Sequence, residues 1–371
     1  MPVSLSPNAN PLLLVSLSGR ALAKSAQRAE WSCSVIDAFA DSDTRAIATQ
    51  CVAAPAWNAK AVAGVLPAPS QVRGLVYGGG LEAMPEVLKH WFRAKKLLGN
   101  GPDILSLVNH PQSFFALLDR LGIEYPEVCF TVPESSGQWL VKQAASSGGG
   151  HVRDWTGSEF IGEQDYFQRY VEGPVISVIF LADGERSQTL GWNTQWTRSG
   201  DYLWAGAVNR ADLNDHQRDV VSSYVEALVS SLKLRGLNSV DFVLQGASPK
   251  LLELNPRPGG TLELYDRDYQ KGLLYWHVKA CAGRLPMPAE RIRSTIRACK
   301  VLYPRSAIRI PRQMDWAKFY HDRPVPGSVI KMGEPLCTVT ASGSNVSSTL
   351  RQLEQRVAQL ERQLLTLRQV A

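Results

Sequence analysis

The chain has 371 residues, of which 44% are apolar and 20% are charged. This composition is typical of globular proteins, and the length exceeds what one ordinary core holds. Its net charge of +6 comes from dispersed basic residues, so we predict no nucleic-acid partner. No apolar run approaches the roughly 20 residues that span a bilayer, and the six cysteines form no C-x-x-C pair. We therefore expect a soluble, cytoplasmic protein with no membrane contact.

The first part of the chain alternates between strand-like and helix-like segments. In chain order, we expect a strand at 12–17, a helix at 21–28, and strands at 34–38 and 74–77. Such alternation with glycine turns predicts an α/β fold that begins with a Rossmann-like parallel sheet unit at 1–98. The run Gly78–Gly80 after the third strand suits either a substrate-facing turn or a tight connection.

The periodicity becomes helical at 111–121, where Gly122 closes the pattern, and a longer helix is expected at 216–232. Strand-like segments lie at 139–142 and 175–181. The predicted units after the first are a small one at 99–175, a large one at 176–300, a β-rich segment at 301–345 and a helix at 346–371.

Polar side chains interrupt two otherwise apolar strands in the large unit. The first strand contains Asp241, and the second contains Glu253 and Asn255, which share one face because they are two residues apart. If the strands are neighbours, three oxygen donors converge, as Mg²⁺ prefers. Arg257 follows and can bind a phosphate or carboxylate through its fork of donors. Each group alone suits a solvated position, but four within apolar strands require partners.

These residues resemble the metal-binding pattern of the ATP-grasp superfamily, an acidic residue on one strand and Glu-x-Asn-Pro-Arg on the next. The resemblance covers about residues 100–280 and implies the ATP-grasp fold, with ATP and Mg²⁺ (or Mn²⁺) as cofactors. It implies that Asp241, Glu253 and Asn255 bind the metal. It also implies that Arg257 and Asn255 act in catalysis, with Arg257 steadying the transferred phosphate.

Upstream segments resemble the nucleotide-binding elements of the same superfamily. Lys142 ends a strand and would contact the α-phosphate and the adenine edge. A loop that resembles the flap over the β- and γ-phosphates consists of Ser146, Ser147, Gly148, Gly149 and Gly150. A segment that resembles the adenine-binding hinge consists of Gln168, Arg169, Tyr170, Val171 and Glu172.

Three positions depart from the superfamily pattern. Gln168 replaces the glutamate that usually opens the hinge. Val175 replaces an acidic residue that usually binds the ribose, a task that we assign to Glu172 in a shifted register. Ser239 replaces an arginine, and we assign its phosphate contact to Arg210.

Two further sets of residues have alternative interpretations. We interpret His151 as a surface residue at the edge of the flap, with phosphate binding as the alternative. Glu263, Tyr265 and Asp266 suit either an acceptor pocket or the ordinary start of a helix.

The last 26 residues contain apolar side chains at alternating spacings of four and three, from Val346 to Leu367. This heptad pattern is typical of coiled coils, and three heptads need a partner. We predict that the helix at 346–371 forms a coiled coil between copies of the chain. The alternative is an amphipathic helix that folds back on its own body.

The resemblance implies an ADP-forming ligase that joins a small-molecule carboxylate to an amine. Segments near Tyr303, Asp322 and Cys337 are similar to a branch of predicted ATP-dependent carboligases. That branch occurs in methylotrophic bacteria with genes for tetrahydromethanopterin and methylofuran cofactors, which implies ligation of a glutamate-like amino acid in cofactor biosynthesis. The alternatives are a biotin-carboxylase-like carboxylating enzyme and a non-catalytic nucleotide-binding assembly protein.

Overall fold

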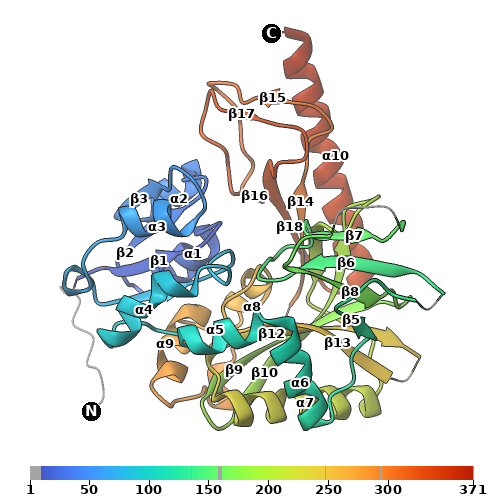
Figure 1. Ribbon diagram of the computed structural model, residues 1–371. Helices are drawn as coiled ribbons and strands as arrows, with labels where there is room; N and C mark the ends of the chain where they lie inside the picture. The colour runs from blue at the N-terminus through green and yellow to red at the C-terminus, as the bar shows by residue number, and fades with distance from the viewer. Residues whose placement is uncertain (1–9, 135, 158–160, 247, 293–294, 371) are drawn as a thin grey trace.

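A computed structural model describes residues 10–370 except 135, 158–160, 247 and 293–294. Its first unit is a parallel sheet in the order β3-β2-β1-β4, shown in blue in Figure 1. Its strands are β1 (Leu12–Val15), β2 (Cys33–Asp37), β3 (Gln50–Ala53) and β4 (Gly74–Tyr77), and its helices are α1 (Arg20–Arg28), α2 (Ser42–Ile47), α3 (Ala59–Val65) and α4 (Pro85–Arg93). The predicted parallel sheet is confirmed. β3 was not predicted, because none of its four residues has a buried apolar side chain.

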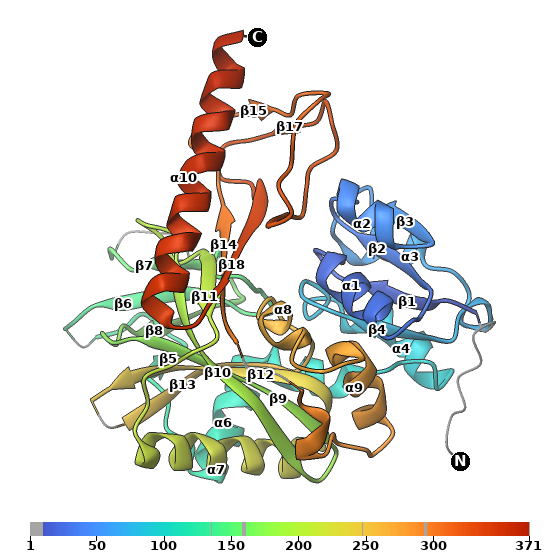
Figure 2. The same cartoon turned by 180° about the vertical axis from the view of Figure 1, so that it is seen from behind.

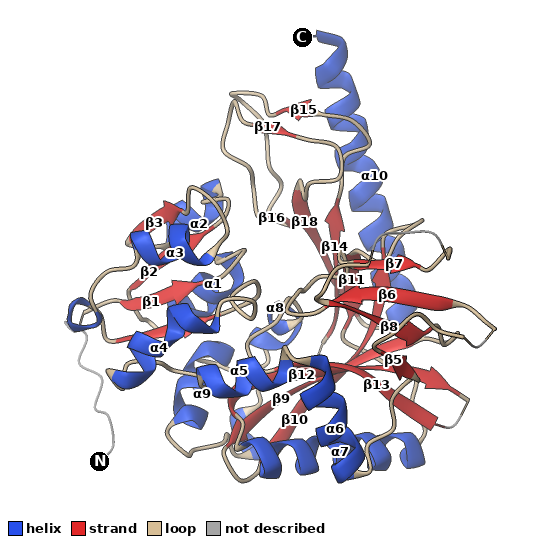
Figure 3. Ribbon diagram, viewed as in Figure 1, coloured by secondary structure: helices blue, strands red, loops and turns tan. Residues whose placement is uncertain are grey.

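An eight-stranded antiparallel sheet forms the centre of the molecule, in the order β13-β12-β9-β10-β11-β14-β18-β16 (Figure 3). Its strands are β9 (Val175–Asp183), β10 (Ser187–Thr197), β11 (Trp204–Val208), β12 (Arg235–Gln245), β13 (Ser248–Asn255), β14 (Ile296–Leu302), β16 (Tyr320–His321) and β18 (Cys337–Gly343). β14 crosses the predicted boundary at residue 300, so the segment predicted at 301–345 shares this sheet with the segment before it.

Helices cover both faces of the central sheet. α6 (Pro111–Leu121) and α7 (Asp215–Leu232) pack on β9 and β12 through a core that contains Phe114, Phe180 and Val225. α9 (Gly272–Cys281), which follows the short α8 (Leu262–Asp266), packs on the opposite face and also contacts α1. One apolar core therefore joins the central sheet to the N-terminal parallel sheet.

A third sheet carries the predicted nucleotide-binding segments. It is antiparallel, in the order β5-β8-β6-β7. Its strands are β5 (Val128–Cys129), β6 (Trp139–Gln143), β7 (Val152–Asp154) and β8 (Asp165–Arg169), and α5 (Pro102–Val108) precedes α6 on the way to it. A small core of Trp139, Val141 and Phe167 stabilises the sheet. A two-stranded ribbon, β15 (Ile308–Arg309) and β17 (Val329–Ile330), completes the set of sheets.

The C-terminal helix α10 (Val346–Val370) packs along β14 and β18 of its own chain (Figure 2). The seam residues Leu353 and Leu360 are both 0% exposed and lie in one core with Val339 and Ala341 of β18. The chain's own sheet thus occupies the face that we predicted would pair with another copy. This arrangement is the alternative in which the helix folds back on its own chain. Oligomerisation stays a prediction, and the apolar face of α10 does not support it. Among the described helices, α10 included, none is long and apolar enough to cross a membrane.

Replacing Leu360 with alanine should lower the free energy of unfolding by about 2–5 kcal/mol, because it leaves a cavity under α10. Urea denaturation measures this loss. Leu365→Ala is the matched control, since Leu365 is 57% exposed, and it should change stability little. If Leu360 held two chains together instead, the substitution would change the sedimentation coefficient and make stability depend on protein concentration.

Candidate active site

The hairpin of β12 and β13 brings the predicted metal-binding residues together. Asp241 lies directly opposite Glu253 in the antiparallel register. The side-chain amide nitrogen of Asn255 donates to Glu253 Oε1 at 2.9 Å and lies 3.4 Å from Asp241 Oδ2. The expectation that these two strands are neighbours is therefore confirmed.

The surroundings shift the pKa values of the two carboxylates in opposite directions. Burial raises the pKa of Asp241, and the adjacent Glu253 carboxylate raises it further. Burial acts in the same direction on Glu253, but hydrogen bonds from Asn255 and Asp241 and the charges of Lys142 and His151 hold the pKa of Glu253 below its usual value. Of the two groups, Asp241 is the one whose surroundings favour the protonated form, and a divalent cation could neutralise both.

The donor set fits a metal that is bound together with phosphates. Among the residues that the structure describes, no three His, Cys, Asp or Glu side chains are grouped to hold a metal ion. Mg²⁺ often needs only one or two carboxylates when substrate phosphates complete its shell, and Asp241 and Glu253 meet that need. Asn255 turns its nitrogen toward them and its oxygen toward Arg257. Ligation by this oxygen would require the amide to rotate.

Arg257 is held by protein groups on two sides. Its Nε donates to Glu82 Oε1 and its Nη2 donates to Asn255 Oδ1 at 2.8 Å. Glu82 comes from the N-terminal unit, and a Cβ at Gly79 would lie 3.6 Å from Arg257 Cζ. This is an ordinary van der Waals distance, so the glycine turn after β4 lies beside the guanidinium, which lines the same cavity as the acidic pair.

A cavity of about 840 Å³ extends from the acidic pair between the three large sheets. The predicted site residues that line it are Lys142, Ser147, Gly148, Gly149, Gln168, Arg169, Tyr170, Val171, Asp241, Glu253, Asn255 and Arg257. Burial lowers the pKa of Lys142, although the charges of Glu253 and Asp241 oppose this shift. The Gln168 Nε2 atom is buried without a hydrogen-bond partner in the described part of the chain, which is expected where a ligand supplies the acceptor.

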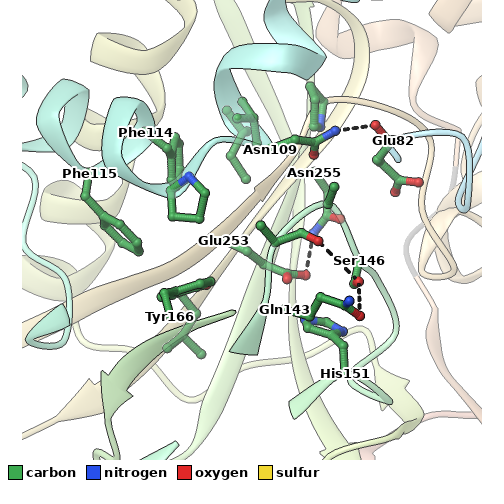
Figure 4. Close-up of a pocket in the computed structure, with 17 residues that line it drawn as sticks. Glu82, Asn109, Phe114, Phe115, Gln143, Ser146, His151, Tyr166, Glu253 and Asn255 are labelled. Carbon is green, nitrogen blue, oxygen red and sulfur yellow. Dashed lines mark hydrogen bonds between the residues drawn. The ribbon is translucent and has the colours of Figure 1, made fainter. Parts of the chain in front are cut away.

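Ser146 and His151 border a smaller pocket of about 70 Å³ on the other side of the acidic pair. Figure 4 shows Ser146 and Gln143 beside Glu253 and Asn255. His151 also lines the large cavity and is close enough to Glu253 for that charge to raise its pKa, although burial has the larger, opposite effect. His151 is half-buried, so its position at the edge of the flap is compatible with both interpretations, and phosphate binding stays the alternative.

Three predicted residues line neither of these cavities. Gly150 faces Leu203, where a Cβ would meet Leu203 Cδ1 at 3.4 Å. Glu172 and Arg210 are exposed, and the Arg210 carbonyl accepts a hydrogen bond from Thr194 Oγ1 at 2.8 Å. Arg210 lies just beyond the end of β11, so the expectation that it replaces the missing arginine at Ser239 gains no support from its position.

The glycine-rich loop rests on the hairpin between β10 and β11. The Trp204 amide donates to the Gly148 carbonyl at 2.9 Å. Gly149 has a φ of +80°, and a Cβ there would lie 1.9 Å from the Tyr202 carbonyl oxygen. The loop can therefore approach the hairpin only because residue 149 has no side chain.

Replacing Gly149 with alanine should weaken ATP binding by about tenfold or more, because the loop must leave the hairpin. Calorimetric titration with Mg-ATP measures the change. Gly148→Ala is the matched control, since Gly148 has a similar φ of +76°, but a Cβ there would meet no atom of the described residues within 4 Å. Equal effects of the two substitutions would show that backbone strain, rather than the contact with Tyr202, matters.

A buried ion-pair cluster forms another wall of the cavity, and no pattern in the sequence indicated it. Arg20 of α1 donates to both carboxylate oxygens of Glu263 in α8, at 2.8 and 2.5 Å. Its Nε donates to Asp322 Oδ1 at 2.8 Å. All three residues line the cavity, so the N-terminal unit, the central region and the segment after β16 meet there.

Glu263 is the one member of its predicted trio that lines the cavity. Tyr265 instead donates to Asn193 Oδ1 at 2.8 Å. Asp266 accepts hydrogen bonds from Ser25 and Arg28 of α1. The position of Glu263 is therefore compatible with an acceptor pocket. Tyr265 and Asp266 instead connect structural elements.

Comparison with known proteins identifies the fold. Residues 112–261 match the model of the ATP-grasp domain family. An uncharacterized protein of Methanocaldococcus jannaschii is 22% identical over 280 residues, which cover 72% of this chain and 69% of that protein.

Two solved structures resemble nearly the whole chain. Pyruvate carboxylase from Rhizobium etli matches 94% of it with a TM-score of 0.74 and 13% identity, although the chain spans only 37% of that enzyme. N5-carboxyaminoimidazole ribonucleotide synthetase from Thermotoga maritima matches 94% of this chain and 98% of its own, with a TM-score of 0.69 and 13% identity. Residues 112–261 thus resemble the ATP-grasp domain family, and the chain has the fold of these solved structures.

Proposed function

We propose that the protein is an ADP-forming ligase, which uses Mg-ATP to convert a substrate carboxylate into an acyl phosphate and transfers the acyl group to an amine. The observation that carries this proposal is the facing pair Asp241 and Glu253, with Lys142 close by in one cavity of about 840 Å³. Such a concentration of half-buried ionisable groups is costly unless it has ligands, and the volume suits a nucleotide and a second molecule.

The residues in the cavity have distinct proposed tasks. Asp241 and Glu253 would hold Mg²⁺ (or Mn²⁺), with Asn255 joining them if its amide rotates. Bound metal would neutralise charge on the β- and γ-phosphates. Lys142 would bind the α-phosphate, and the loop Ser147–Gly149 would place backbone N–H groups over the phosphates.

Adenine would lie against the hinge. There the side-chain amide nitrogen of Gln168 is buried without a hydrogen-bond acceptor among the described residues, and Tyr170 and Val171 line the cavity. Arg257, held by Glu82 and Asn255, would steady the transferred phosphate. Because these contacts fix Arg257, its charge needs little reorganisation during the reaction.

The chemistry follows in two steps. A carboxylate oxygen of the substrate attacks the γ-phosphorus, the new O–P bond forms, and ADP leaves. The amine nitrogen then attacks the carbonyl carbon, the C–N bond forms, and the C–O bond to phosphate breaks as the nitrogen loses a proton. The glycine-rich loop would exclude water, because hydrolysis of the acyl phosphate would waste ATP.

A second candidate substrate is bicarbonate, a small anion that ATP could activate in the same way. The names of the two similar enzymes, a carboxylase and a carboxyamino-ribonucleotide synthetase, both indicate carboxylation. The non-catalytic alternative has less support, because an assembly protein has no need of the paired Asp241 and Glu253. Ligation of a glutamate-like amino acid in a one-carbon cofactor pathway remains a proposal that rests on the sequence resemblance alone.

Mg-dependent ADP release tests the proposal, with carboxylic acids and amines supplied in combination and bicarbonate included among the acids. We expect release that requires one acid and one amine together and is absent from the Glu253→Ala variant. Release with bicarbonate and an amine alone would support carboxylation instead. ATP binding without turnover under any combination would favour the assembly protein.

A further inference from the structure

Asp41 is a buried carboxylate without a hydrogen-bond or ion-pair partner among the described residues. Its residue is 7% exposed and lines the large cavity. Within the described part of the chain, its side chain has no hydrogen bond or ion pair, and it does not cap α2, which it precedes. A largely buried carboxylate that faces a cavity instead of a protein donor favours either a proton or a cationic ligand.

The surrounding carboxylates all have donors of their own. Asp37 accepts backbone N–H bonds from Gly19, Phe39 and Ala40. Asp43 accepts the backbone N–H groups of residues 322 and 323 at 3.0 and 2.9 Å. The Arg20 guanidinium bridges the two others, Glu263 and Asp322.

The local charge therefore favours a cation at Asp41. Burial raises the pKa of Asp41 to about 8, and the carboxylates of Asp322, Asp37 and Asp43 add to this shift, whereas Arg20 opposes it. Arg20 is already committed to its two carboxylates. Asp41 is thus the carboxylate that lacks a counter-charge, and it borders the cavity without a hydrogen bond or ion pair to the described residues.

Apolar side chains border the same part of the cavity. Leu17, Leu22 and Phe39 belong to its lining, and Leu17 and Phe39 remain 39% and 38% exposed. A divalent metal ion would need several oxygen ligands, whereas a primary ammonium needs few acceptors and tolerates an alkyl chain beside apolar groups. The chemistry of the site therefore matches an alkylammonium ion better than a metal.

We propose that Asp41 binds the ammonium group of the acceptor amine at the junction of α2, Arg20 and Asp322. This inference rests on the proposed ligase function and adds to it the class of acceptor, a primary alkylamine that arrives as its ammonium ion. This ion would transfer one proton to the Asp41 carboxylate, so that its nitrogen has a free lone pair for the attack. Asp41 would select this substrate and hold it in the cavity that it shares with Asp241 and Glu253.

The probe for this site is n-butylammonium chloride, observed by saturation-transfer NMR in the presence of the full chain without ATP. n-Butanol and sodium chloride serve as controls for the alkyl chain and for ionic strength. We expect butylammonium to bind and Asp41→Asn to weaken its affinity at least tenfold, as loss of a charge-assisted hydrogen bond predicts. Asp103→Asn, which alters an exposed aspartate at the start of α5, should leave binding unchanged.

Unchanged binding in Asp41→Asn, equal binding of butanol, or no binding by the native chain would each overturn the proposal. Circular dichroism verifies folding, and Asp41→Ala replaces the first variant if that one does not fold. Because ATP is absent, the result is independent of turnover. A chain that binds butylammonium through Asp41 but never releases ADP would contradict the ligase and keep the cation site.

Discussion

Replacing Glu253 with glutamine should lower the rate of Mg-dependent ADP release by about 10²–10³-fold, the usual cost of losing one charged group that stabilises a transition state. Glutamine keeps the shape of the side chain and can still bond Asn255, so folding should be preserved. It removes one of the two carboxylates that face each other across β12 and β13. The loss should therefore appear in the rate and in the Mg²⁺ requirement rather than in stability.

The matched control is Glu226→Gln, which alters an exposed glutamate on α7 and should leave ADP release unchanged. Thermal melting of both variants verifies folding. A Glu253→Gln variant with native rates and native Mg²⁺ dependence would refute the assignment of this pair to the metal.

Replacing Arg20 with methionine should lower the free energy of unfolding by about 3–5 kcal/mol, because it leaves two buried carboxylates without their partner. The Arg20 side chain is 4% exposed and joins Glu263 and Asp322 across three parts of the chain. Arg28→Met on the same helix is the matched control, since Arg28 is 31% exposed and pairs with one carboxylate, Asp266. Its loss should cost clearly less. Urea denaturation compares the two variants, and equal losses would contradict this account.

The effect of Arg20 should also depend on pH. Burial alone would raise the pKa of Glu263, but the charge and hydrogen bonds of Arg20 lower it from 4.5 to about 2. A carboxylate whose pKa is depressed in the folded state contributes stability above its unfolded pKa and loses it as the pH falls. The difference between native chain and Arg20→Met should therefore be largest near neutral pH and shrink between pH 4.5 and 2.

The metal-binding hairpin was predictable because its information is local. Glu253 and Asn255 share a face through the two-residue period of a strand. β12 ends at Gln245 and β13 begins at Ser248, and these strands, which are neighbours in sequence, are also neighbours in the sheet. The helix ending at Gly122 was predictable for a similar reason, since this glycine adopts a φ of +65°.

The ion-pair cluster at Arg20 was not predictable from local patterns. Arg20 is 243 residues from Glu263 and 302 from Asp322, and no period or motif in the sequence relates such positions. The C-terminal helix was predictable as a helix, but the surface that covers its apolar face was not, for a different reason. A heptad spacing specifies an apolar face on the helix, but it does not distinguish the chain's own sheet from a second copy as the surface that covers Leu360.

The most direct test of the central claim is calorimetric titration of the full chain with ATP in the presence and absence of Mg²⁺. We predict saturable binding that is strengthened by Mg²⁺ and weakened by Gly149→Ala, because the cavity between the flap, Lys142 and the acidic pair would hold the nucleotide. Failure of the native chain to bind ATP under either condition would contradict the account.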